Sequence, residues 1–424
     1  MERLISVLGC FVFLAMAWLF SNNKRQINYR VVLWGLLLQA LLAFIILKTS
    51  FGYTVFFYVG AAITKLLSFT DAGISWLIGD SFRNNLDGAK EAGSSLPIQV
   101  WNPENSQFVT TGIVVALYIL PAIVFFASLT SVLYYSGVMQ KIVTGMAKVT
   151  SKLLGTSGAE SLSVASNVFV GPIEGALLVK PYISGMTRSE LMAIMTGGFA
   201  TITGGFMALY VHWGFDVRHL LAASVMSAPA ALVMAKIIFP ETETLQTRVN
   251  FEKKAANVLD AAVSGAKDGL KIALTVGAAI LVFMAVIAMM DFCLLKVGGL
   301  FGLGDLTLEK ILGYAFAPVA LIMGIETADV LNIGYLLGTK VALNEFVAFV
   351  KLGQWQVTLS PRSFTIGTYA LCGFANFSMI AIQIAGIGGI APERKQDVAK
   401  LAFKAMCAGA LASWLTATIA GILI

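Results

Sequence analysis

The feature that most constrains this chain is a series of long apolar windows from which charged residues are almost absent. The windows 4–20 and 31–48, for example, contain one charged residue between them, Lys48. A transmembrane helix needs about 20 apolar residues to cross a hydrocarbon core of about 30 Å. Only 12% of the 424 residues are charged and 58% are hydrophobic, whereas soluble chains carry about 25% charged residues. We therefore predict an all-α polytopic membrane protein.

The same windows exclude other classes of protein. Soluble enzymes and DNA-binding proteins need more polar side chains than this chain has to cover a particle of its size. Continuous apolar runs also differ from the alternating strands, about ten residues long, of a membrane β-barrel. The net charge of +6 is assigned to cytoplasmic loops, which are rich in Lys and Arg, and not to nucleic acid. The four cysteines and two histidines lack metal-ligand or disulfide spacing.

The basic residues predict a topology. The loop with Lys24, Arg25 and Arg30 is placed in the cytoplasm, so the N-terminus lies outside. Helix 4–20 is a retained span because no basic segment precedes it and no small-residue cleavage site follows it. An interfacial helix is expected over 55–80, an outside loop over 81–108, and a cytoplasmic amphipathic helix after the third span. The remaining spans are predicted over 109–137, 188–211, 218–238, 269–297, 363–390 and 397–422.

Two further stretches do not fit simple spans. Residues 159–184 form two apolar arms around Val170-Gly171-Pro172, and residues 308–350 form longer arms around the break Gly324–Asp329. An arm of about ten helical residues is about 15 Å long, half of a membrane. Both stretches are therefore predicted to be re-entrant hairpins.

Each predicted hairpin precedes a helix with a glycine-containing interruption. The first interruption is Gly197–Ile202 and the second is Cys372–Phe377. The first hairpin would enter from inside and the second from outside. An inverted-topology repeat with broken helices near the membrane midplane is typical of secondary transporters.

The first hairpin tip carries the first candidate polar site. Pro172 suits the first position of a new helix, which places Glu174 in that helix's first turn, facing the positive end of the helix dipole. An ionisable residue at this depth usually marks a substrate or ion path, although Glu174 could also act only as a cap. Asn167, nearby free carbonyls and the Thr201 hydroxyl form a candidate oxygen cage for a monovalent cation. Thr201 could instead bond only its own helix.

In the second hairpin, Asp329 and Glu326 flank the predicted break, with Asn344-Glu345 further along. Asp329 would begin the second arm and Asn376 would lie in the facing broken helix. A carboxylate with a nearby carboxamide can accept from and donate to sugar-type hydroxyls. No nucleophile–base pair, P-loop or dinucleotide fingerprint is present, so transport is not driven by ATP within this chain. A membrane-embedded enzyme or a receptor is the alternative in a different class.

At these motifs the sequence resembles the concentrative nucleoside transporter family. The segments that carry the resemblance are Asn167–Tyr182, Gly197–Gly205, Asn344–Phe349 and Ala370–Ser378. The resemblance implies eight transmembrane helices, interfacial helices and two re-entrant hairpins, assembled as a homotrimer in the inner (plasma) membrane. It also implies sodium-coupled uptake of nucleosides by an elevator motion of a transport domain against a scaffold.

The resemblance carries individual residues over. It assigns a sodium site to Asn167, Val170, Thr201 and Ile202. It assigns nucleobase contact to Glu174, ribose contact to Asp329, and further substrate contacts to Phe374 and Asn376. The chain departs from the family at Pro172, Ile173 and Met379, where polar groups that meet the ligand are replaced by apolar ones. Base recognition would then rest on Glu174 and on packing by Ile173 and Phe206.

The leading hypothesis is a sodium–nucleoside symporter with altered base recognition and without enzymatic activity. The alternative within the class is a proton-coupled symporter, or a symporter for a non-nucleoside polar solute. Sodium is the coupling ion of the leading hypothesis, and the predicted partners are a nucleoside-like molecule, membrane lipid and copies of the same chain. The predicted domains are 1–108 and 109–158 for the scaffold, 159–239 for the first hairpin repeat, 240–307 for a linker and scaffold helix, and 308–424 for the second repeat.

Overall fold

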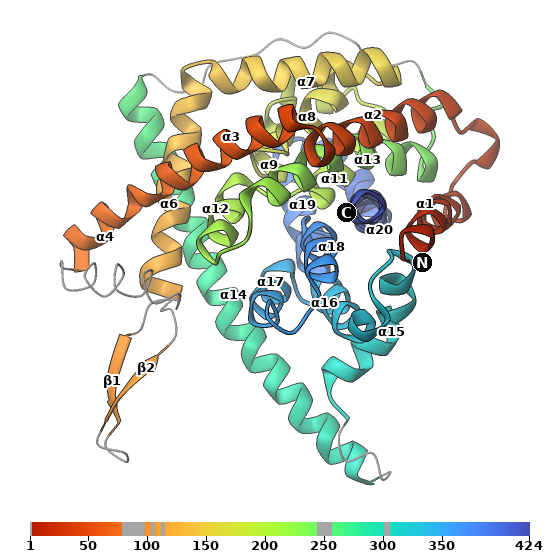
Figure 1. Cartoon of the computed structure of the whole chain (residues 1–424). Helices are drawn as coiled ribbons and strands as arrows, with labels where there is room; N and C mark the ends of the chain where they lie inside the picture. Colours follow the sequence, from red (N-terminus) through yellow and green to blue (C-terminus); the bar gives the residue numbers. More distant parts are fainter. Residues whose placement is uncertain (1, 79–97, 103–106, 112–114, 244–256, 301–305) are drawn as a thin grey trace.

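A computed structural model describes residues 2–78, 98–102, 107–111, 115–243, 257–300 and 306–424 (Figure 1). In chain order its elements are α1 (Glu2–Leu19), η1 (Lys24–Gln26), α2 (Tyr29–Lys48), α3 (Ser50–Ser68), α4 (Thr70–Ile78), β1 (Ile98–Asn102), β2 (Gln107–Thr111), α6 (Val115–Tyr135), α7 (Val138–Leu154), α8 (Gly158–Ser166), α9 (Pro172–Leu177), α10 (Lys180–Ile183), α11 (Arg188–Ala200), α12 (Gly204–His212), α13 (Val217–Ile238), α14 (Val258–Leu300), α15 (Leu308–Ile322), η2 (Thr327–Asp329), α16 (Val330–Ala342), α17 (Glu345–Gln354), α18 (Pro361–Leu371), α19 (Phe377–Ile390), η3 (Pro392–Arg394) and α20 (Lys395–Leu423). The predicted all-α class is confirmed.

The described strands form one small ribbon. β1 and β2 pair antiparallel, with Ile98 opposite Thr111 and Asn102 opposite Gln107. The ribbon projects away from the helices in Figure 1. It lies where the sequence predicted only an outside loop, and it delays the start of the next helix. That helix, α6, begins at Val115 and not near residue 109.

Several helices are long and apolar enough to cross a membrane. Within the described residues five segments qualify, and a sixth is added if the bent pair Ile123–Tyr135 and Val138–Leu154 counts as one span. The five are Glu2–Leu19, Tyr29–Lys48, Arg188–Val211, Val217–Ile238 and Pro392–Leu423. α14 and the pair α18–α19 occupy the positions of the remaining predicted spans. The chain is thus a multi-pass membrane protein, as predicted.

Contacts between distant segments agree with the predicted topology. The Arg3 guanidinium donates to the carbonyl of Ile424 at 2.6 Å, so both chain ends lie on one side. The Asn22 amide donates to the carbonyl of Ile238 at 2.9 Å, so the first loop and the end of α13 lie together. The sequence places both of these segments in the cytoplasm.

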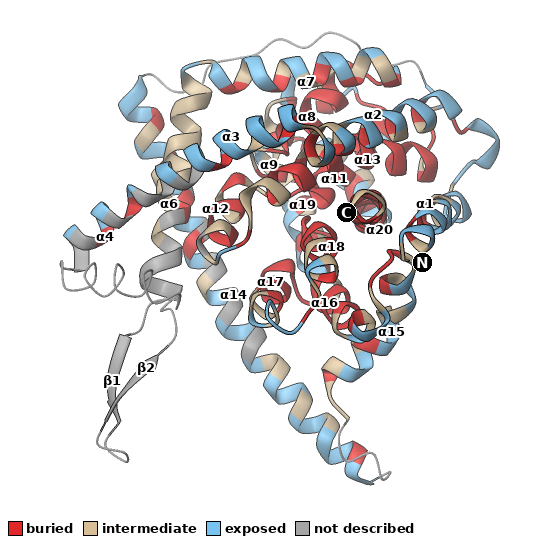
Figure 2. Cartoon of the chain, in the orientation of Figure 1, coloured by how far each residue is buried: buried red, intermediate tan, exposed pale blue. Residues whose placement is uncertain are grey.

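The centre of the molecule is formed by α11, α13 and α20, which pack against one another (Figure 2). Of the apolar window in α13, 94% is buried, compared with 22% of the window in α1. Small residues allow this close packing: a Cβ on Gly409 of α20 would lie 2.3 Å from the Cβ of Phe199 in α11. These helices therefore form a buried core around the break that follows α11.

A second helix pair, α6 and α14, runs along one side of this centre (Figure 1). Gly265 and Gly269 of α14 lie against α6: a Cβ on Gly265 would be 2.7 Å from the Ala127 carbonyl, and one on Gly269 would be 2.8 Å from the Val124 Cα. Glycines four residues apart lie on the same face of a helix and let two membrane helices approach closely.

The first hairpin is built as predicted, and the second is shifted. α8 and α9 meet at the segment 167–171, and Pro172 opens α9. The predicted break 324–329 instead separates α15 from α16, and the tip of the second hairpin lies at Leu343-Asn344, between α16 and α17. The break was placed wrongly because Gly324, with φ of +82°, interrupts the chain as strongly as a tip would. Its Cα packs against α1, where a Cβ would lie 2.0 Å from the Ser6 hydroxyl.

The helix interruptions are close to their predicted positions. α11 continues through Gly197 and Gly198 and ends at Ala200, so the break lies at 201–203 and not at 197–202. The second break, 372–376 between α18 and α19, lies where it was predicted. The two glycines of α11 are packing positions: a Cβ on Gly198 would lie 2.5 Å from the Cβ of Pro172.

Candidate functional site

The two helix breaks lie against each other. Gly373 has a φ of +137°, which non-glycine residues rarely adopt. A Cβ at Gly373 would lie 2.9 Å from the carbonyls of Phe199 and Ala200, at the end of α11. The Ser413 hydroxyl of α20 donates to the Cys372 carbonyl at 3.0 Å. The unpaired backbone groups of both broken helices are therefore gathered at one place.

The tip of the first hairpin is fixed to the first broken helix. The Gly204 amide, which opens α12, donates to the carbonyl of Phe169 in the tip at 3.1 Å. Asn167 is fully buried. With its amide nitrogen and oxygen exchanged, it donates to the Gly171 carbonyl (3.3 Å) and accepts from the Gly198 amide (3.1 Å). The position of the tip thus depends on α11 and α12.

A cavity of about 1000 Å³ lies next to these breaks. Both hairpin tips, the starts of α12 and α19, and the helices α6 and α14 contribute to its wall. The predicted substrate residues that line it are Pro172, Ile173, Glu174, Phe206, Phe374, Asn376 and Met379. The wall is mainly apolar with a few polar groups, as in most small-molecule sites. Phe206 and Phe374 meet edge to face there, with ring centroids 5.2 Å apart.

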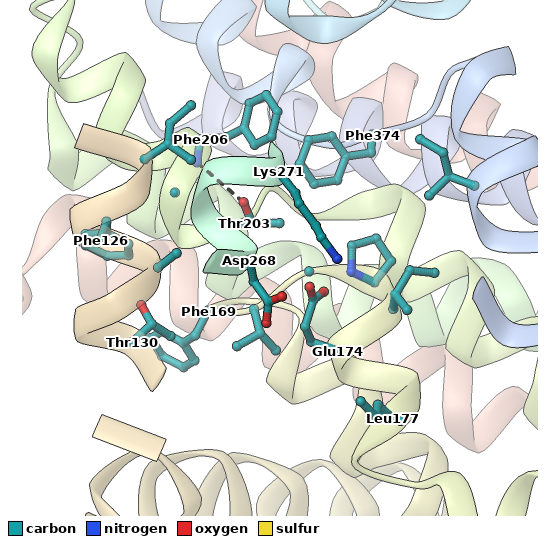
Figure 3. Close-up of a pocket in the computed structure, with 18 of the residues that line it drawn as sticks. Phe126, Thr130, Phe169, Glu174, Leu177, Thr203, Phe206, Asp268, Lys271 and Phe374 are labelled. Atoms are coloured by element: carbon teal, nitrogen blue, oxygen red, sulfur yellow. Dashed lines mark hydrogen bonds between the residues drawn. The ribbon is translucent and has the colours of Figure 1, made fainter. Parts of the chain in front are cut away.

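One end of the cavity gathers charged side chains. Figure 3 shows Glu174 from α9 and Asp268 from α14 pointing toward the same space, with Lys271 of α14 reaching in beside them. Glu174 is exposed and lines this cavity. The sequence motifs did not indicate Asp268 or Lys271, because these residues come from a helix outside the hairpin repeats.

The other end holds a buried acid–amide pair. The Asn376 amide donates to a Glu345 carboxylate oxygen at 2.9 Å, and Asn376 Oδ1 accepts from the Met379 amide at 2.8 Å as the N-cap of α19. Asn344 caps α17 by accepting from the Val347 amide at 2.9 Å. Glu345 and Asn376 are each 3% exposed, and both line the cavity. Their remaining lone pairs and protons suit ligand hydroxyls.

Asp329, the predicted ribose-binding acid, is not among the residues that line the cavity. Its carboxylate accepts from the Ser360 amide at 3.1 Å, and it lies between α15 and α16, next to the start of α18. The shift of the hairpin tip explains this placement. Glu345 sits at the tip and lines the cavity in place of Asp329. Its position directly after Asn344 in the motif Asn344–Phe349 was the available signal.

The residues of the predicted sodium site also come together. Asn167 and Ile202 are fully buried, and Thr201 is 2% exposed. The Thr201 hydroxyl donates to the Gly197 carbonyl at 2.9 Å, which leaves its oxygen lone pairs available. Within the described chain, the carbonyls of these three residues and of Val170 accept no backbone hydrogen bond. Such carbonyl and hydroxyl oxygens suit a hard monovalent cation.

Known proteins match this chain over its whole length. Residues 8–81 match the "Na+ dependent nucleoside transporter N-terminus", residues 116–213 match "Nucleoside recognition", and residues 219–421 match the "Na+ dependent nucleoside transporter C-terminus". The chain is 42% identical to "Uncharacterized transporter YutK" of Bacillus subtilis, over 100% of both chains. It is 36% identical to human "Solute carrier family 28 member 3", over 100% of this chain and 60% of the human protein.

Solved structures agree with these matches. A structure described as "CNTnw in an inward-facing substrate-bound state" superposes with a TM-score of 0.90 at 40% identity, and covers 100% of this chain and 98% of that one. A second, of a CNTnw double variant in an outward-facing state, gives the same TM-score, identity and coverage.

Proposed function

Because this chain belongs to the concentrative nucleoside transporter family, we propose that it takes up nucleosides by coupling their movement to an inward flow of sodium. Proteins of this family transport nucleosides and are not enzymes. The chain is accordingly a multi-pass protein of the plasma membrane.

The observation that carries the proposal is one cavity that has the Glu345–Asn376 pair at one end and Glu174 at the other. Glu345 and Asn376 hydrogen-bond each other at 2.9 Å and would hold the ribose hydroxyls. Glu174 lines the same cavity together with Ile173 and Phe206 and would meet the base. A nucleoside has two matching parts: a ribose that carries several hydroxyls and an aromatic base.

Base recognition is proposed to be loose. Pro172 and Ile173 present apolar atoms to the cavity beside Glu174, and Ile173 packs against α19, where a Cβ on Gly386 would lie 2.2 Å from its side chain. A site rejects a ligand strongly when its own polar groups are left unpaired. Because Pro172 and Ile173 offer no hydrogen-bonding side chain to the base, several bases would be accepted. A non-nucleoside solute with a hydroxylated ring is the second candidate, favoured by the same apolar positions.

Sodium coupling is proposed to act through the first hairpin tip. Asn167 and Val170 would bind the ion, and Glu174 follows in the same tip. An ion at these oxygens would draw the tip against Thr201 and Ile202 and so fix Glu174 toward the cavity. Sodium and substrate would then favour the same conformation, which makes their binding mutually cooperative.

The mechanism is proposed to be an elevator. The cavity lies between α6 and α14 on one side and the hairpin repeats on the other, so sliding of the repeats 159–239 and 308–424 against α6 and α14 would carry the substrate across. α1 and α2 pack against α13 and α20, so they contact the moving part in this conformation. We also propose the domain limits predicted from the sequence and assembly of the chain as a homotrimer.

Uptake into sealed proteoliposomes tests this function. Labelled uridine, adenosine and cytidine should accumulate above equilibrium with an inward sodium gradient. Replacement of sodium by choline at constant pH should abolish that accumulation. Accumulation that persists in choline and follows a pH gradient would assign the coupling to protons. A lack of nucleoside uptake under every gradient would favour the non-nucleoside solute.

A further inference from the structure

The helix starts of the two hairpin repeats are equally spaced along the chain. The N-caps of α9, α11 and α12 are Gly171, Thr187 and Thr203. The N-caps of α17, α18 and α19 are Asn344, Ser360 and Asn376, each 173 residues after its counterpart. The two repeats therefore match over the hairpin tip and the broken helix without an insertion or deletion.

This register pairs Asn167 of the first repeat with Lys340 of the second. It also pairs Gly197, in the last turn of α11, with Ala370 in the last turn of α18. Each paired side chain lies beside the last turn of the broken helix in its own repeat. Asn167 lies against Gly197, where a Cβ would be 3.2 Å from its side-chain amide, and the Lys340 Nζ donates to the Ala370 carbonyl at 2.8 Å.

Lys340 is fully buried. Within the described residues, no carboxylate lies within 4.0 Å of its Nζ, so its hydrogen-bond partner is a backbone carbonyl. A buried ammonium without a paired acid is costly, and packing alone does not require one. The last carbonyls of a helix carry a partial negative charge, and they are the kind of ligand that binds sodium at a broken membrane helix.

We propose that Lys340 is a tethered cation that occupies, in the second repeat, the position that sodium takes in the first. This inference rests on the proposed sodium coupling and deepens it. Lys340 would neutralise the end of α18 at all times, and so hold the break 372–376 in the conformation that presents Asn376 to Glu345. The sugar end of the cavity would then be permanently formed, while the base end would depend on sodium.

The tethered cation predicts how many sodium ions are transported with each nucleoside. The second position is taken by a side chain, so only the first repeat can bind sodium, and one sodium ion should cross with each nucleoside. Lys340 acts through the carbonyl of α18 and is a positioning residue, since it does not line the cavity.

The coupling ratio of the unmodified protein gives the first test. In proteoliposomes with a fixed sodium gradient, the membrane potential at which uridine flux reverses reports the number of sodium ions per uridine. A ratio of one supports the tethered cation. A ratio of two, with sodium dependence intact, overturns it without affecting the symport proposal. Loss of all sodium dependence would instead remove the symport proposal, and the inference with it.

Variants at Lys340 give the second test. Lys340→Asn copies the first repeat, and a second sodium ion should then be needed, so the Hill coefficient for sodium should rise from about one toward about two, the number of sites. Lys340→Met removes the cation and supplies no oxygen ligand, so raising sodium should not restore its uptake. Lys351→Met, at a half-buried lysine of α17, is the control and should keep a Hill coefficient of about one.

The reciprocal variant Asn167→Lys completes the test. It places a tethered cation in the first repeat, so uridine binding measured by calorimetry should no longer depend on sodium. Sodium activation of Lys340→Asn or Lys340→Met identical to that of the unmodified protein would overturn the inference, because the charge would then have no role. If the variants at Lys340 fail to fold, the coupling ratio of the unmodified protein still decides between one ion and two.

Discussion

The two hairpin repeats use one backbone arrangement for two different tasks. The first repeat places uncharged Asn167 beside the last turn of its broken helix and Glu174 in the cavity. The second places Lys340 at the equivalent position and pairs Glu345 with Asn376. The comparison suggests that a duplicated scaffold can keep its helix starts while the charges diverge. One repeat would then respond to an ion while the other is fixed.

The repeats also differ in how they are anchored. Lys236 of α13 lies 2.7 Å from the Glu160 carboxylate of α8 and 3.1 Å from that of Glu241, and donates to the Ser189 hydroxyl at 3.0 Å. The register places Ile333 opposite Glu160 in the second repeat. The ion cluster thus attaches only the first hairpin to α13.

The largest expected effect follows from breaking that anchor. Lys236→Met leaves Glu160, which is fully buried, without its cation. Removal of one partner from a buried ion pair costs about 3–5 kcal/mol, so the thermal unfolding temperature in detergent should fall markedly. The exposed Lys404, which bonds Asn22, provides the matched control Lys404→Met, which should unfold near the unmodified protein. Equal unfolding of the two variants would mean that the cluster does not anchor the hairpin.

The next effect separates the two acids of the second repeat. Glu345→Ala removes a buried carboxylate from the cavity and leaves the Asn376 amide unpaired. Hydrogen bonds to charged groups contribute about 1.5–3 kcal/mol, so uridine affinity should fall by about 10- to 150-fold by calorimetry.

Asp329→Ala is the matched control for Glu345→Ala. It removes a carboxylate of the same repeat that accepts a hydrogen bond from the Ser360 amide and does not line the cavity. It should lower the free energy of unfolding by about 1.5–3 kcal/mol, as for a lost hydrogen bond to a charged group, and leave uridine affinity unchanged. If Asp329→Ala loses uridine affinity and Glu345→Ala does not, Asp329 and not Glu345 binds the ribose.

A smaller effect is expected in the first repeat. Glu174→Gln keeps the shape of the side chain and removes its charge, so any charge-assisted bond to the base becomes a neutral one. The difference of about 1 kcal/mol or more should weaken apparent affinity by about tenfold and remove most concentrative uptake at low substrate. Initial rates at several uridine concentrations measure this. Normal transport with unchanged affinity would reduce Glu174 to a cap of α9.

The smallest effect concerns the apolar tip. The double variant Pro172→Gln with Ile173→Thr introduces two hydrogen-bonding side chains next to Glu174. Each new bond contributes about 0.5–1.5 kcal/mol, so uridine should bind more tightly and bases should be better distinguished. Ile173→Val, which changes volume but adds no donor, is the control. Equal affinities before and after the double change would mean that these positions do not face the ligand.

The sequence by itself determined the class of protein, the first hairpin and the approximate breaks of both broken helices, and it predicts the sides of the loops. These follow from local signals: an uncharged window, a basic loop, and Gly171-Pro172 at a helix start. Such signals act over a few residues, so they can be read along the chain without knowledge of what packs against them.

Only the tertiary structure decided which acid of the second repeat lines the cavity and that Lys340 bonds a helix-end carbonyl. Gly324 and Leu343-Asn344 both interrupt helices, and only contacts to α1 and to the cavity distinguish the loop from the tip. The partners of Glu345 and Lys340 lie about 30 residues away along the chain, and Asp268 comes from a helix outside both repeats. A buried charge is defined by what replaces its water, and the fold supplies that replacement from distant parts of the sequence.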